Sequence, residues 1–188
     1  MKNKFLVGIG IILFYSGLAA FGGTVPTARN YYVNPLIGKS MNAGTLEEPF
    51  LNLEHVSRLQ LNPGDSILLA AGTVINGSLI LKNVNGTAEL PVVISSYQGQ
   101  KNTESHATID AKGYSNGILL ENCSHVRIEE LNVTADGGGL SDVSDKTGMR
   151  CGVLVKTSEQ GTFGNIILNR LSIENVFFEE EGFQRGAK

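Results

Sequence analysis

Short apolar runs separated by glycine and asparagine fill the chain from Asp65 onward, and none of them has a helical period. Because a strand places alternate side chains on opposite faces, and because Gly and Asn favour turns, this pattern predicts an all-β region. We expect strands at residues 66–70, 78–82, 91–97, 107–110, 117–122, 125–133, 152–156 and 165–173.

The segment before Asp65 has a different pattern. Residues 31–48 begin with an aromatic strand and continue as a loop rich in Asn, Gly, Ser and Pro, which favour turns. Apolar residues then recur every three positions, at Phe50, Leu53, Val56 and Leu59. This spacing predicts one short amphipathic helix, which the turn at 62–65 ends.

An internal repeat indicates how the strands are arranged. VRIEELNV at 126–133 aligns without a gap with IILNRLSI at 166–173, 40 residues later. A second pair of matching runs begins at Gly117 and Gly152. A repeat of this kind predicts a solenoid, whose coils pair equivalent strands in parallel about 4.8 Å apart.

Polar residues mark the corners of the predicted coils. Glu129 with Glu130, and Asn169 with Arg170, interrupt the two copies of the repeat and suit a bend in the chain. Asn122 precedes another turn, and we expect it to join an internal stack of corner asparagines. The predicted helix would lie across the first coil and cover its open strand edges.

The amino terminus and the composition limit the possible environments. Residues 1–28 have the two lysines, the apolar run and the small residues of a secretory signal peptide, and the run is shorter than the roughly 20 residues that span a bilayer. We therefore expect a secreted or periplasmic protein without stable membrane insertion. A net charge of −3 argues against nucleic acid as a partner. Cys123 and Cys151 form either a disulfide or two small buried thiols.

Several motifs resemble the amino-terminal part of secreted right-handed parallel β-helix proteins of the pectate-lyase-like superfamily. They are YYVNP at 31–35, GTLEEPFLNLEHV at 44–56, LNPGDSILLAAGTVINGSLIL at 61–81, NGTAELPVVISSY at 85–97, and ATIDA at 107–111. The resemblance implies a right-handed parallel β-helix with a short N-terminal capping helix. Residues 29–64 would form the entry strand, loop and helix, and residues 65–188 the coils. The small number of coils implies an N-terminal portion of a longer protein.

The longest interruption between strands, residues 136–150, is the best candidate for a chemical site. Asp136, Asp142 and Asp145 offer the oxygen ligands that Ca²⁺ prefers. The resemblance implies that Ca²⁺ or basic side chains would hold the carboxylate of an acidic sugar. Lys146 or Arg150 could face that carboxylate or remove a proton in β-elimination. A solvated polar loop is the alternative interpretation.

Two further basic residues are candidates for substrate binding. Arg127 alternates with core residues on a predicted strand and faces outward, and Lys156 ends another strand. Both could also be ordinary surface residues. We expect an exported polysaccharide-active protein, a lyase of acidic glycans according to the resemblance. The alternatives are a carbohydrate-binding or surface β-helix without catalysis, or an inactive fragment of a longer enzyme.

Overall fold

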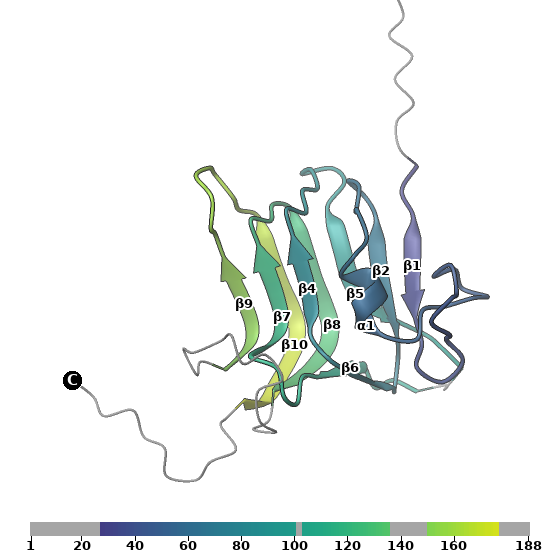
Figure 1. Ribbon diagram of the computed structural model, residues 1–188. Helices are drawn as coiled ribbons and strands as arrows, with labels where there is room; N and C mark the ends of the chain where they lie inside the picture. The colour runs from purple at the N-terminus through teal and green to yellow at the C-terminus, as the bar shows by residue number, and fades with distance from the viewer. Residues whose placement is uncertain (1–26, 101–102, 136–149, 177–188) are drawn as a thin grey trace, which may run out of the picture.

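The computed structural model describes residues 27–100, 103–135 and 150–176, and almost all of its regular structure is parallel β-strand (Figure 1). The all-β prediction is therefore confirmed. The elements are β1 (Asn30–Val33), α1 (Leu53–Val56), β2 (Ser66–Ala70), β3 (Val74–Asn76), β4 (Leu79–Lys82), β5 (Val92–Tyr97), β6 (Ala107–Asp110), β7 (Asn116–Glu121), β8 (Val126–Ala135), β9 (Cys151–Lys156) and β10 (Ile166–Val176).

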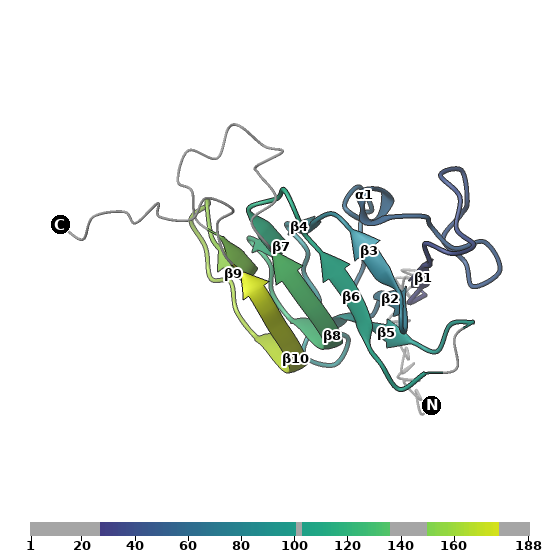
Figure 2. The same cartoon turned by 90° about the horizontal axis from the view of Figure 1, so that it is seen from below.

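The strands form two parallel sheets that curl around one core (Figure 2). The larger sheet runs β1-β2-β5-β8-β6-β3, with β10 also paired to β8, and the smaller sheet runs β4-β7-β9. The first half of β8 pairs with β5 and its second half with β6. The long strand β8 therefore connects β1, β2 and β5, before the bend, with β6 and β3, after it.

The strand register confirms the internal repeat. Ile166 pairs with Val126 and Ile173 with Val133, as the alignment of the two copies predicts. On the smaller sheet Ile118 pairs with Val153, which is the predicted offset between the second pair of runs. Each turn of the chain therefore lies against the previous one, and its strands satisfy their backbone groups across the turns rather than in hairpins.

The bend in β8 lies at Glu130, whose φ is 56°, and Arg170 has a φ of 49° at the same point of β10. The following Leu131 is fully buried. The predicted corner stack also exists: the Asn122 amide donates to Asn83 Oδ1 at 3.3 Å and to Ser158 Oγ at 3.1 Å. The side-chain oxygen of Asn122 accepts the Ser158 N–H at 2.8 Å.

The helix is shorter than predicted: it covers four residues rather than the whole stretch 50–59. An apolar residue at every third position fits 3₁₀ turns, which have three residues per turn and are usually short, better than a long α-helix. Asn52 caps its start by accepting the Glu54 N–H, and the Ser57 hydroxyl bonds back to the Leu53 carbonyl. The same hydroxyl accepts the Ile80 N–H at 3.2 Å, so the helix covers the free edge of β4.

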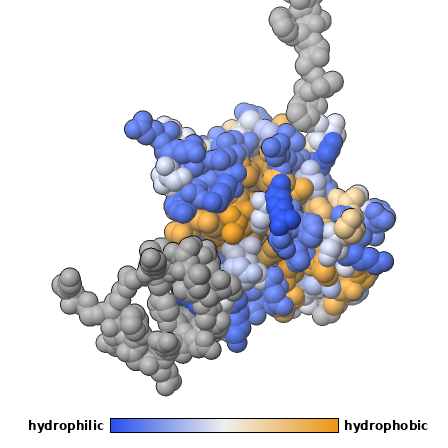
Figure 3. Space-filling model, in the orientation of Figure 1, coloured by the Kyte–Doolittle hydropathy of each residue, from blue (hydrophilic) through white to orange (hydrophobic). Residues whose placement is uncertain are grey.

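Aliphatic side chains from every turn fill the interior. The largest fully buried ones include Leu53, Ile67, Leu69, Ile75, Leu79, Ile94, Ile109, Ile118, Leu120, Ile128 and Leu131. Burial decreases toward β9 and β10, where Val155 and Leu168 are each 47% exposed. Figure 3 shows hydrophobic surface among polar areas around β7 and β9.

Both cysteines are free thiols, so the alternative of a disulfide is not realised. Cys123 is buried, and its Sγ lies 3.5 Å from the Leu81 carbonyl oxygen. Within the three described ranges, no helix has the length and apolar character to cross a bilayer.

Candidate functional site

Two neighbouring depressions lie on the outer surface, where β5 gives way to β6 and where β8 bends, and together we call them the corner groove. Its first depression has a volume of about 340 Å³ and its second about 260 Å³. The two adjoin, because His106 and Thr108 flank the buried Ala107, and Glu130 and Asn132 flank the buried Leu131. The first is lined by Ala71, Ser96, Tyr97, Gln98, Glu104, Ser105, His106 and Glu130, and the second by Thr108, Asn132, Val133, Thr134, Ser172 and Glu174.

Ser96 fixes the backbone at the centre of the groove. Its hydroxyl donates to the Glu130 carbonyl at 2.5 Å and accepts the Ala107 N–H at 2.8 Å. It therefore replaces ladder hydrogen bonds where the chain leaves β5 for the loop that leads to β6. The Gly72 N–H donates to the His106 carbonyl at 3.4 Å and holds the end of that loop.

Tyr97 forms one wall of the first depression. Its ring packs edge-to-face on Tyr32, with 5.0 Å between ring centroids, and its hydroxyl accepts the Asn34 amide at 3.5 Å. Burial of the phenol raises the pKa of Tyr97, which outweighs the lowering effect of the hydrogen bond from Asn34. The side chain therefore stays neutral at physiological pH and offers an aromatic wall held in one orientation.

Carboxylates dominate the charge of the corner groove. Glu104 and Glu130 line the first depression and Glu174 lines the second. Arg170 donates to Glu130 at 2.7 Å, and this ion pair links the two last turns of the larger sheet. Among the lining residues His106 is the only basic type. The groove therefore repels anions more than it attracts them.

Hydrogen-bonding side chains form a ladder across β6, β8 and β10 in the second depression. Thr108 pairs in register with Asn132, and Asp110 with Thr134. The Asn132 amide donates to Thr108 Oγ1 at 3.5 Å, and the Thr134 hydroxyl donates to Asp110 Oδ1 at 3.1 Å. Such a surface presents both donors and acceptors, which suits the hydroxyl groups of a neutral sugar.

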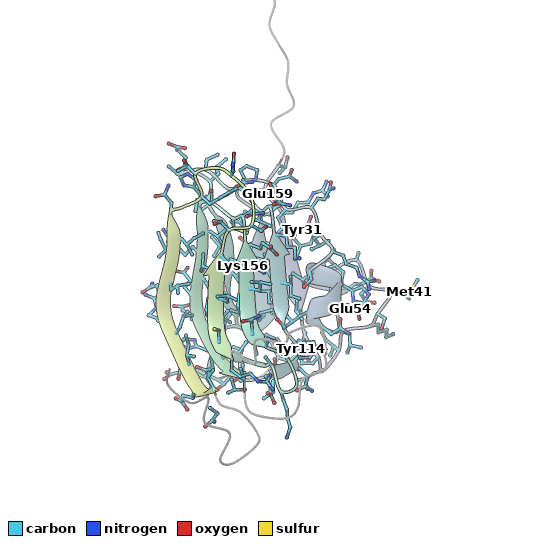
Figure 4. The ribbon with its side chains drawn as sticks, turned by 60° about the vertical axis from the view of Figure 1, so that its left-hand side comes forward. Tyr31, Met41, Glu54, Tyr114, Lys156 and Glu159 are labelled. Atoms are coloured by element: carbon cyan, nitrogen blue, oxygen red, sulfur yellow. The ribbon has the colours of Figure 1, made fainter. Side chains whose placement is uncertain are left out.

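Of the sequence-predicted site residues, the structure describes Arg127, Arg150 and Lys156, and each of these three has different neighbours. Asp136, Asp142, Asp145 and Lys146 lie outside the described residues. The Arg150 guanidinium donates to the Tyr114 carbonyl. Lys156 ends β9, and Figure 4 shows it apart from Tyr114, to whose carbonyl Arg150 donates. Arg127 faces outward on the larger sheet, and it lines a pocket separate from the corner groove.

Lys156 takes part in a charged ladder rather than a groove. It pairs in register with Glu121, which pairs with Lys82, and the two lysines lie 3.6 Å and 3.1 Å from the Glu121 carboxylate. The Ser158 hydroxyl and Lys82 hydrogen-bond to this carboxylate, and together with the charge of Lys156 they lower the pKa of Glu121. This arrangement ties the three strands of the smaller sheet to one another.

No cluster of three or more His, Cys, Asp or Glu side chains suited to a metal ion occurs in the described ranges. The predicted Ca²⁺ site at Asp136, Asp142 and Asp145 stays a prediction, because its residues lie outside those ranges.

Sequence reasoning missed the corner groove. Its residues come from β5, β6, β8, β10 and the loop before β6, and only the register between turns makes them neighbours. The available signal was the polar residue at every second position of the repeat, such as Asn132 and Thr134 in one copy and Ser172 and Glu174 in the other.

No protein-family model matches the chain, and no curated protein matches it. Similar solved structures include those of the GH136 lacto-N-biosidase from Eubacterium ramulus, as the native protein and as the selenomethionine derivative. Each is 29% identical to this chain with a TM-score of 0.65, over 79% of this chain and 27% of that chain. The chain thus spans about a quarter of the length of the glycoside hydrolase that it matches.

Proposed function

We propose that this protein binds a neutral glycan in the corner groove, as a carbohydrate-active protein of the right-handed parallel β-helix type. The observation that carries the proposal is the composition of the groove: an oriented aromatic wall at Tyr97 beside ladders of hydroxyl, amide and carboxylate groups. Protein sites for sugars need an apolar ring face and convergent hydrogen-bonding groups. The similarity to a glycoside hydrolase supports the same class of ligand.

The charge of the groove favours a neutral sugar over the acidic glycan that the sequence predicts. A uronate polymer would meet the carboxylates of Glu104 and Glu174 beside the Glu130–Arg170 ion pair. β-Elimination also needs a base and a group that neutralises the sugar carboxylate, and the groove offers only His106. The lyase hypothesis therefore receives less support from the groove than neutral-glycan binding does.

A direct binding measurement tests the proposal. Calorimetry of the full chain with an oligosaccharide that ends in lacto-N-biose should give saturable binding, whereas polygalacturonate should not bind in the groove. Tyr97→Ala should lower the affinity for the neutral oligosaccharide at least about tenfold, because it removes the aromatic wall. Tyr114→Ala, an exposed tyrosine outside the groove, is the matched control. Equal affinities for the two variants, or no binding at all, would refute the proposal.

Hydrolysis is a second candidate function, favoured by the presence of two carboxylates in one depression. Glycosidases use one carboxyl group as acid on the leaving oxygen and a second as nucleophile or base. Glu130, which Arg170 orients, and Glu104 on the loop before β6 could take these roles. Release of lacto-N-biose from a nitrophenyl glycoside, lost in Glu104→Gln and in Glu130→Gln, would support hydrolysis. Binding without release would support a binding protein.

The handedness of the coil and the location of the protein are part of the same proposal. Parallel strands joined by crossovers in one sheet are right-handed in about 98% of cases, which supports a right-handed solenoid here. A crystal structure with a left-handed crossover between β2 and β5 would contradict it. The predicted signal peptide supports export to the periplasm or the medium, where glycans are accessible; fractionation of the native host tests this location.

A further inference from the structure

A second pocket lies at the beginning of β8, on the other side of the bend from the second depression of the corner groove. It has a volume of about 250 Å³, which is below the size of pockets that take drug-sized ligands. Its walls come from the turn before β5 and from the starts of β8 and β10. Its lining includes His125, Arg127, Asn165 and Ile167.

Arg127 is the charged group of this pocket, and nothing in the described structure neutralises it. Its neighbours in register are Val93 on β5 and Ile167 on β10, so apolar side chains flank it on both sides. Its Nε is buried and has no hydrogen-bond partner. Buried donors are almost always paired, and a buried unpaired donor on a charged group has a large free-energy cost.

The other polar groups of the pocket are donors or neutral. Asn165 Nδ2 lies 3.3 Å from His125 Nε2. His125 and Asn165 have φ values of 52° and 58°, so the same corner conformation repeats in successive turns. None of the residues that line the pocket is acidic.

We propose that the Arg127 pocket binds an oxyanion, namely the carboxylate or sulfate group of an acidic sugar. A guanidinium matches the planar pair of oxygens in such a group and forms two parallel hydrogen bonds with it. Of the two apolar flanks, Ile167 is 47% exposed, so the pocket is open to a ligand from the β10 side. The site goes beyond the proposed function, because its ligand is anionic and its residues are not those of the corner groove.

The test is a titration of the full chain, followed by NMR, with glucuronate, N-acetylglucosamine 6-sulfate, inorganic sulfate and glucose. We expect the two acidic sugars to shift the signals of His125 and Asn165, and glucose to leave them unchanged. Arg127→Gln should weaken binding at least about tenfold, since a charge-assisted bidentate pair is lost. Arg58→Gln removes an equal charge from an exposed residue in the turn after α1 and should leave the affinity unchanged.

The arms of the titration separate the sources of the anion. Tighter binding of the acidic sugars than of inorganic sulfate supports a glycan ligand, and equal binding supports an oxyanion site filled by the free ion. Affinity should fall as NaCl is raised, because salt screens the charge. Identical affinities of Arg127→Gln and wild type, or no shifts with any anion, would overturn the proposal. Neither result depends on Tyr97, so failure here leaves the neutral-glycan proposal standing.

Discussion

The corners of this protein depend on residues that adopt positive φ without being glycine. They are Asn83, Asn122, His125, Glu130, Asn165, Arg170 and Asn175. The sequence predicted the role of Asn122, because a short amide side chain tolerates this conformation and can stack on its equivalent. It predicted a bend near Glu130 and Arg170 but not their backbone conformation, because long side chains seldom adopt it.

Replacement of Asn122 tests the corner stack. Asn122→Ala removes three side-chain hydrogen bonds from a buried site, and it should lower the free energy of unfolding by about 2 to 3 kcal/mol. Asn175→Ala is the control for backbone conformation, because Asn175 has a φ of 52° and is exposed. It should cost about 1 kcal/mol. Equal losses of unfolding free energy for the two variants in urea denaturation would show that the asparagine stack adds nothing to stability.

At the scale of elements, periodicity predicted most of what the structure contains. The eight expected strands match β2 and β4 to β10 within a few residues. Strands such as β6 and β8 alternate buried and outward positions, which is the pattern that the sequence shows. Periodicity missed β3, because three residues are too few to show a period. It also missed the corner groove, because the alignment of Thr108 with Asn132 depends on turn lengths that no local pattern reveals.

The ladder on the smaller sheet should make stability depend on pH. The folded pKa of Glu121 lies below its ordinary value of 4.5, so the unfolded chain binds the proton more readily. The contribution of Glu121 to the free energy of unfolding is therefore complete above pH 4.5 and is lost as the pH falls through the folded pKa. In urea denaturation at a series of pH values, Glu121→Gln should reduce the loss of stability in acid. Glu54→Gln, in an exposed pair on α1, should not; equal curves for the two variants would be evidence against the ladder.

At the scale of the whole molecule, the described strands stack in parallel, and each of them pairs only with strands of the adjacent turns. Inner strands such as β5 and β8 have partners on both sides, whereas β9 and β10 each pair on one side only within the described ranges. Leu120 and Ile128 are fully buried, while Val155 and Leu168 on the last turn are half exposed. In such a fold, stability is a sum of turn and interface contributions.

Hydrogen exchange measures this gradient directly. Amides of β5, β7 and β8 should exchange at least about tenfold more slowly than those of β9 and β10, because the last turn can open without disturbing the rest. Uniform protection across all strands would show that the stack unfolds as one unit.

NMR mapping of a neutral oligosaccharide onto the full chain tests directly whether the corner groove binds a glycan. A glycan ending in lacto-N-biose should shift amide signals of the corner groove, at Ser96, Tyr97, His106 and Asn132, and leave those of the β4-β7-β9 sheet unchanged. Saturable shifts confined to the groove are the predicted result. Shifts confined to the other sheet, or none at millimolar ligand, would contradict the assignment of the corner groove as a glycan site.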